Sequence, residues 1–220
     1  MLQAATLKFL KDLEKNNNKT WFEQHRKQYE TAKTDFHFFI DTLIKKISVF
    51  DKPIGELAAK NCTFRINRDV RFSKNKNPYK NNMAGYFNKA GKKGIGAGYY
   101  FHLQPGKSFA AGGIWAPEPA VLAKIRQEID YNFDEWKKII NSNSFKKNFP
   151  AGIETDGSLS RPPKGYDISN PAIHYIKMKN FVVRKRFTDT GMLGKGAVND
   201  IANTFKALKP MIDFFNRAID

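Results

Sequence analysis

The chain has 220 residues, of which 41% are hydrophobic and 27% are charged, and its formal net charge is +17. That length and composition allow one large hydrophobic core. No stretch approaches the ~20 consecutive apolar residues that a membrane-spanning helix needs, so an integral helical membrane protein is excluded. We therefore expect a soluble, strongly basic globular protein.

Cys62 is the only cysteine, so no internal disulfide can form and no oxidising compartment is indicated. Residues 1–15 contain acidic side chains and lack an apolar run, which favours an amphipathic helix over a targeting segment. We therefore expect a cytoplasmic location. No base is paired with Cys62 in the sequence, and we interpret it as a half-buried thiol at a strand edge, not as a nucleophile.

The positive charge is concentrated in two segments. Residues 60–93 contain ten lysines and arginines against one acid, and residues 161–195 contain eight against two. The remaining residues are nearly neutral. A concentrated positive field attracts anions, although lysine-rich surface loops can also be no more than solvated faces.

Apolar residues at helical spacing predict two helices near the start of the chain. The first contains Leu7–Leu13. The second covers residues 20–47 as one helix of about seven turns, beginning with a capping box formed by Thr20 and Glu23. His25 lies on the apolar stripe of this helix, and we interpret it as a hydrogen-bonded core histidine.

Residues 64–72, FRINRDVRF, alternate between apolar and polar side chains, which is typical of a half-buried strand. Arg68 breaks the alternation because it falls on the apolar face. We expect Arg68 to be substantially buried and paired with a carboxylate or with several backbone carbonyls, since an unpaired buried guanidinium is very costly.

Further along the chain, residues 98–104 and 108–115 flank the turn dipeptide Pro105-Gly106 and predict a hairpin. The pair Gly112 and Gly113 indicates a bulge or a close approach of another backbone. Residues 180–187 form another alternating strand.

Helices are predicted for residues 117–129, for a segment that follows Asn132 as N-cap, and for residues 197–218, where Pro210 should kink or split the helix. The order of elements predicts an α+β fold in which an antiparallel sheet of about four or more strands packs with N-terminal, central and C-terminal helices. No linker divides the chain, so we expect residues 1–220 to form a single domain.

Four runs of the sequence carry a resemblance to a known family: NNNKTWFEQHRKQYE, FRINRDVRFSKNKNPYKNN, GYYFHLQPGKSFAAGGIW and RPPKGYD. They resemble the bacterial "domain of unknown function 2461" family of conserved hypothetical proteins, from about Leu7 to the C-terminal helix. The family pattern often has an acid where Asn75 stands, so a role of that acid is not expected here. The resemblance implies one domain, but no activity, cofactor or catalytic residue.

The strongest candidate site is a cluster of cations. Guanidinium groups offer fixed forks of donors that match phosphate or carboxylate oxygens. The candidate anion-binding residues are Arg65, Arg68, Arg71, Lys74, Lys76, Lys80, Arg184 and Arg186. We expect the two basic segments to meet in space, with Arg65 or Arg71 sharing a face with Arg184 or Arg186. The expected partner is a nucleic acid or another phosphate-containing ligand.

Exposed aromatic side chains in the same region are candidates for stacking on bases: Tyr79, Tyr86, Phe87, Tyr99, Tyr100 and Trp115. Most of them are expected in the core, because large aromatic residues dominate such interiors. The strand signature of a known RNA-binding module is absent.

Two alternative functions stay open. The first is an enzyme acting on a phosphorylated or carboxylated small molecule, for which Asp69, His102 and Tyr166 are the residues to consider. The second is a structural or interaction protein in which Arg68, Asp69 and their neighbours form an ion network and the charge is incidental. Metal-binding and phosphate-loop motifs are absent, so we expect no metal and no cofactor. The sequence leaves the oligomeric state open.

Overall fold

The computed structural model describes residues 1–154 and 157–219. Two short 3-10 helices cover Lys52–Glu56 and Gly91–Lys93, and the strands are β1 (Met83–Phe87), β2 (Gly98–Leu103), β3 (Phe109–Ile114) and β4 (Phe181–Arg186). The α-helices are α1 (Ala4–Lys15), α2 (Lys19–Gln24), α3 (Arg26–Ile47), α4 (Ala59–Cys62), α5 (Pro119–Tyr131), α6 (Phe133–Asn141), α7 (Asn143–Asn148), α8 (Ile173–Ile176), α9 (Asp189–Leu193) and α10 (Ala197–Ile219). None of the helices described is both long enough and apolar enough to cross a membrane.

The four strands form one sheet in the order β1-β2-β3-β4, and every neighbouring pair is antiparallel. The predicted hairpin is β2 and β3, and the predicted strand at residues 180–187 is β4. The strand β4 joins the sheet only after the chain has formed α5 to α8. The expected α+β fold with an antiparallel sheet and flanking helices is confirmed.

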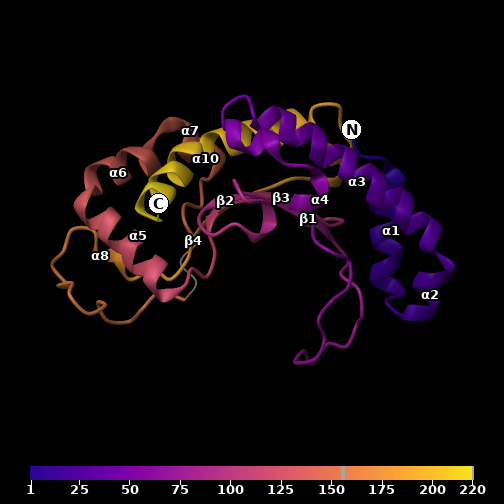
Figure 1. Ribbon diagram of the computed structural model, residues 1–220, viewed down its shortest axis with the longest axis horizontal. Helices are drawn as coiled ribbons and strands as arrows, with labels where there is room; N and C mark the ends of the chain where they lie inside the picture. Colours follow the sequence, from indigo (N-terminus) through magenta and orange to yellow (C-terminus); the bar gives the residue numbers. More distant parts are fainter. Residues whose placement is uncertain (155–156, 220) are drawn as a thin grey trace.

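Helices α3 and α10 cover one face of the sheet, while α1 and α2 lie at one end and α5, α6 and α8 at the other (Figure 1). Alternate strand residues point into this helical layer. The ring of Phe101 lies 5.4 Å from Phe39 of α3, and the ring of Tyr99 lies 5.1 Å from Phe205 of α10. The hydrophobic core therefore lies between the sheet and these two helices.

The adjacent glycines of β3 allow α10 to approach the sheet closely. A Cβ atom at Gly112 would lie 2.6 Å from Cδ1 of Leu208. At Gly113, where φ is +118°, a Cβ atom would collide with the carbonyl oxygen of Phe181 and lie 3.2 Å from Cε of Met211. The close backbone approach expected from the glycine pair is confirmed.

The predicted strand at residues 64–72 was wrong, and the first strand is β1 instead. That segment contains a single isolated bridge, between Asn67 and Tyr79, and a second bridge just before it pairs Thr63 with Gly85. Its alternation did not reflect one buried face, because Phe72 is 95% exposed while Ile66 is 5% exposed. The segment instead folds back on the residues that follow it: the backbone N–H of Arg68 donates to the carbonyl of Pro78, and that of Lys80 donates to the carbonyl of Ile66.

The single helix predicted over residues 20–47 was also wrong. The side chain of Asn18 caps α2 by accepting a hydrogen bond from the backbone N–H of Trp21, so the helix begins before Thr20. At His25 the backbone leaves the helical region, with φ −107° and ψ 15°, and α3 begins after it. The imidazole of His25 is half-buried, contacts the carbonyl of Trp21 at 2.8 Å and stacks on the Trp21 ring. Pro210 lies within α10, which is not split there.

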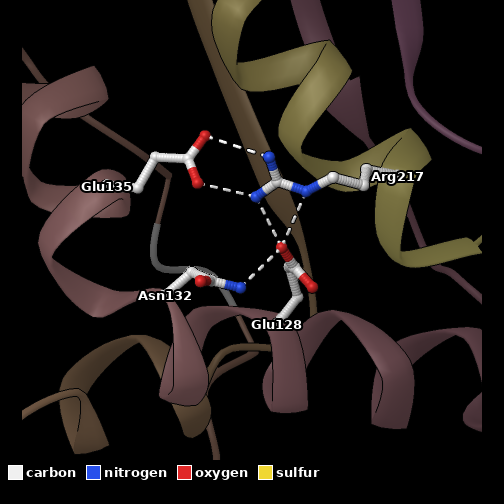
Figure 2. Close-up of polar contacts among 4 residues, drawn as sticks. All are labelled: Glu128, Asn132, Glu135 and Arg217. Atoms are coloured by element: carbon white, nitrogen blue, oxygen red, sulfur yellow. Dashed lines mark hydrogen bonds and ion pairs between the residues drawn. The ribbon is translucent and has the colours of Figure 1, made fainter.

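A polar cluster joins α10 to α5 and α6 (Figure 2). The guanidinium of Arg217 contacts Glu128 at 2.6 Å and Glu135 at 2.7 Å. Asn132 directly precedes α6 as predicted, but its side chain does not cap that helix. Its amide instead donates to the carboxylate of Glu128 at 2.9 Å, which holds Glu128 toward Arg217.

Candidate anion-binding site on the open sheet face

The face of the sheet that α3 and α10 leave uncovered carries polar and aromatic side chains. The register pairs Tyr86 with Tyr100 and Tyr100 with Ala111. On the next strand Ala111 pairs with Arg184, so these positions lie side by side across the sheet. We define the open face by the side chains of Tyr86, Tyr100, His102, Phe109, Arg184 and Arg186.

Beside β1 lies the basic loop, which we define as residues 63–82 and which projects away from the sheet (Figure 1). Its base is fixed by Asn17, which donates to the carbonyl of Tyr79 at 2.9 Å and accepts from the Tyr79 backbone N–H at 3.0 Å. The Tyr79 ring also stacks on Phe22 with a centroid distance of 3.9 Å. The loop is therefore anchored at its base, while Phe72 near its far end is exposed.

Arg68 organises the interior of the basic loop. It is half-buried, and its guanidinium donates to the carbonyl of Asn77 at 2.9 Å and to the hydroxyl of Ser73 at 3.3 Å. Its backbone N–H donates to the carbonyl of Pro78. The prediction of a buried Arg68 paired with a carboxylate or several carbonyls is therefore corrected: Arg68 pairs with one carbonyl and one hydroxyl inside a loop.

A first, open hollow of about 510 Å³ lies between the basic loop and the strands β1 and β2. Arg68, Asp69 and Lys80 line it from the loop, and Tyr100 and His102 line it from the sheet. A second hollow of about 440 Å³ adjoins it, because Tyr100 lines both and Arg184 lines the second. Residues from both basic segments thus reach one sheet face. From the basic loop, Arg68 and Lys80 line the first hollow. Neither Arg65 nor Arg71, which were predicted to share a face with Arg184 or Arg186, lines either hollow.

Three side chains on β2 and just beyond it form a hydrogen-bonded chain at the first hollow. Nε2 of His102 lies 3.0 Å from the amide oxygen of Gln104, and Nδ1 lies 3.1 Å from the hydroxyl of Tyr100. With its Nε2–H tautomer, His102 donates to Gln104 and accepts from Tyr100. Burial lowers the pKa of His102 below its usual value and raises that of Tyr100. Both groups are therefore held neutral near pH 7.

Arg184 connects the open face to Glu154, which precedes β4 in the chain. Its guanidinium binds both carboxylate oxygens of Glu154, at 2.5 and 2.8 Å, and lies 4.9 Å from the centroid of Phe109. Phe109 in turn stacks on His102, with ring centroids 4.7 Å apart. This places a cation, an aromatic ring and an imidazole in one continuous row.

The ammonium of Lys80 is held where the loop meets the sheet. It donates to the carbonyl of Arg65 at 2.9 Å and lies 5.7 Å from the centroid of Phe64. Burial lowers the pKa of Lys80, and the nearby charge of Arg65 lowers it further. An approaching anion would therefore find a partly desolvated cation, on which each contact is stronger than in water.

Two of the eight candidate cations are already paired with carboxylates. Arg71 contacts Asp69 at 2.6 Å and Arg184 contacts Glu154. Within the part of the chain that is described, the remaining six make no ion pair with a carboxylate: Arg65, Arg68, Lys74, Lys76, Lys80 and Arg186. The bidentate hydrogen bonds from Arg71 lower the pKa of Asp69, which stays ionised.

Of the three residues considered for catalysis, Asp69 and His102 line the same hollow. Tyr166 does not line this hollow. Burial raises the pKa of its hydroxyl, and the charges of Asp130 and Arg126, both in α5, also act on it. Sequence reasoning missed Gln104 and Glu154. The period of two in residues 98–104 would have placed Gln104 on the face of His102, whereas nothing in the local pattern links Glu154 to Arg184.

Residues 5–214 match the model of a family described as "Conserved hypothetical protein (DUF2461)". No curated protein and no solved structure matches the chain. The match therefore extends over nearly the whole chain, but it supplies no ligand and no role for any residue.

Proposed function

The chain belongs to the DUF2461 family, whose description names no activity, and from this premise we propose a function on the geometry of the open face and the basic loop. The protein is a binding module for an anionic, phosphate-bearing partner, either a nucleic acid or a phosphorylated ligand. Its proposed location is the cytoplasm, where the single cysteine stays reduced.

One observation carries this proposal: among the described residues, six cations without a carboxylate partner lie on the basic loop and on β4, and two of them, Arg68 and Lys80, line a hollow together with Tyr100 and His102. If these cations served only a structural ion network, their charge would stay uncompensated, which would lower the stability of the fold. An anion that bridges the loop and the sheet removes this repulsion, and arginine and lysine side chains supply the donors that phosphate oxygens accept.

The test is a salt titration of binding to a labelled single-stranded oligonucleotide and to inorganic polyphosphate. Each phosphate contact contributes about 0.7 to 0.9 to the slope of log K against log salt. The double variant Arg65→Ala, Lys74→Ala should therefore lower the slope by about 1.5 units. Both side chains are exposed, so its thermal midpoint should stay close to that of the wild type.

The matched control is Lys45→Ala, Lys46→Ala, which removes the same charge from exposed positions on α3, on the opposite side of the sheet. It should leave the slope nearly unchanged. A wild-type protein that binds neither anion, even at low salt, contradicts the proposal and favours the alternative in which the charge is incidental. Unfolding of the loop variant would show that the cluster is structural.

An enzyme acting on a phosphorylated or carboxylated small molecule is the second candidate. It is favoured by the neutral His102, which lines a hollow together with Asp69 and Lys80. The variant His102→Ala distinguishes the two candidates, because only the enzyme should lose activity. Loss of turnover in a screen of phosphate esters with unchanged binding would support catalysis, whereas absence of turnover in the wild type supports the binding module alone.

A further inference from the structure

The second hollow on the open face has the form of an aromatic slot, which we define by Tyr86, Tyr100, Phe109 and Trp115 as its walls. Tyr86 and Tyr100 are register partners on β1 and β2, and both line the hollow. Trp115 follows β3 and is 66% exposed, although it is the largest apolar side chain at this face. The slot is therefore open to solvent, and four of its ten lining residues carry aromatic rings.

The floor of the slot is nearly flat because small residues meet there on adjacent strands. Gly98 pairs with Gly113, and Ala111 pairs with Tyr100. A Cβ atom at Gly98 would lie 2.7 Å from the hydroxyl oxygen of Tyr86, so only glycine lets this ring lie over the strand. The Tyr86 hydroxyl donates to the carbonyl of Gly96 at 2.9 Å, which fixes the wall in place.

The opposite wall is also held by the backbone. Ala116 has a φ of +45°, a conformation that is uncommon for a residue with a side chain. Its backbone N–H donates to the side-chain oxygen of Asn180 at 2.7 Å, which holds the turn after β3. Trp115 is thereby kept at the rim of the slot instead of packing into a core.

Charge at the rim identifies the occupant. Arg184 lines the slot and uses Nε and Nη2 for Glu154, so its Nη1 donors make no hydrogen bond to a described residue. Arg186 lies two residues further along the same face of β4, with Lys80 across the sheet beyond Tyr100. A ligand that suits this arrangement is a flat ring joined to phosphate groups.

We propose that the aromatic slot binds an unpaired base of single-stranded nucleic acid, with the phosphates of the strand directed toward Arg186 and the basic loop. The base stacks between Trp115 and the tyrosine walls, as rings of any base sequence can. A duplex is excluded from the slot, because the faces of its bases are already stacked. This inference rests on the proposed function and names its partner.

The experiment compares four probes at one low salt concentration: a single-stranded oligonucleotide, an abasic strand of the same length, the corresponding duplex, and inorganic polyphosphate. Stacking of one base contributes about 1–3 kcal/mol, which is roughly a five- to 150-fold change in affinity. The single strand should therefore bind about fivefold or more tightly than the abasic strand. Its binding should also quench tryptophan fluorescence.

Variants assign the effect to the slot. Trp115→Ala should abolish the quench and reduce the preference for the strand with bases to about twofold or less, with an unchanged salt slope. Trp115→Phe should retain most of the preference. Ala111→Leu, which fills the floor and leaves Trp115 in place, should remove the preference by a second route. Phe38→Ala, an equally exposed ring on α3, is the control and should change nothing.

The outcomes separate the slot from the wider function. Equal affinity of the wild type for the normal and abasic strands overturns the slot, while salt-dependent binding of both leaves the anion-binding function standing. A preference for bases that survives both Trp115→Ala and Ala111→Leu also overturns the slot. Failure to bind any of the four probes overturns the proposed function together with this inference.

Discussion

The surroundings of His102 keep its imidazole neutral and thereby preserve the chain from Tyr100 to Gln104. Burial lowers its pKa first, the hydrogen bond to Gln104 partly opposes the change, and the charge of Arg184 lowers it further. Protonation would turn Nδ1 into a donor and remove the acceptor that the Tyr100 hydroxyl uses. The hydrogen-bonded chain at the hollow therefore depends on His102 staying neutral.

Stability should decrease as the pH falls below about 6.5, the usual pKa of histidine in an unfolded chain. In that range the unfolded state binds a proton at residue 102 while the folded state does not, so acid favours unfolding. His37, whose pKa is also lowered mainly by burial, acts in the same direction. The measurement is the thermal midpoint between pH 8 and pH 5. A flat profile for the wild type, or an equally steep one for His102→Gln, would contradict this assignment.

Cys62 should react slowly with thiol reagents. Its side chain is fully buried at the end of α4, not half-buried at a strand edge, and burial raises its pKa from 9.0 to about 11. Such a shift reduces the thiolate fraction about a hundredfold near pH 7.5. Native protein should therefore be labelled by a disulfide reagent at least about a hundredfold more slowly than protein unfolded in urea. Rapid labelling of the native protein would show that α4 opens readily.

At the scale of elements, the glycine pair of β3 lets both β4 and α10 approach that strand closely. Gly113→Ala should destabilise the fold by roughly 3 kcal/mol, because it adds a positive-φ penalty and a collision with the Phe181 carbonyl. Gly106→Ala is the matched control, since Gly106 has a φ of +70° and nothing within 4 Å of its missing Cβ. It should cost about 1 kcal/mol. Urea denaturation measures both, and equal losses would refute the close approach.

The elements that the sequence predicted correctly are those whose pattern coincides with burial. In β2 the buried Tyr99, Phe101 and Leu103 alternate with side chains of the open face, as the period of two requires. Residues 64–72 showed the same alternation, but Phe64 and Phe72 are exposed. The first strand of the structure, MAGYF, gave only a weak alternation of apolar and polar residues in the sequence. Its small residues make room for neighbouring side chains, such as that of Ile40, and do not themselves present large apolar groups.

The candidate site was predictable only where local charge defines it. Arg68 and Lys80 were found from the density of cations, and His102 from its residue type. The pairing of Arg184 with Glu154 joins residues 30 positions apart and depends on the tertiary fold. The anchoring of Tyr79 by Asn17 spans 62 positions. No local pattern contains such information, so the sequence could not show which cations are already paired.

At the scale of the whole molecule, nearly all buried apolar side chains of the described residues form one contiguous cluster that extends from Leu2 to Phe215. Because the helices at both ends of the sheet share this core, we expect a single cooperative unfolding transition. At about 0.7 kcal/mol per residue, its enthalpy should be about 150 kcal/mol near 60 °C. Calorimetry checks this through equality of the calorimetric and van't Hoff enthalpies. Two resolved transitions would contradict a single domain.

The position of α10 has a consequence for synthesis of the chain. Residues 83–114, which form β1 to β3, leave the ribosome well before Phe205, the residue of α10 that packs on Phe87 and Tyr99. At about 5–20 residues per second, this interval lasts several seconds or more. During that time α3 has already been synthesised, but the part of the aromatic inner face that α10 covers stays exposed. Exposed hydrophobic surface of this kind is what chaperones bind.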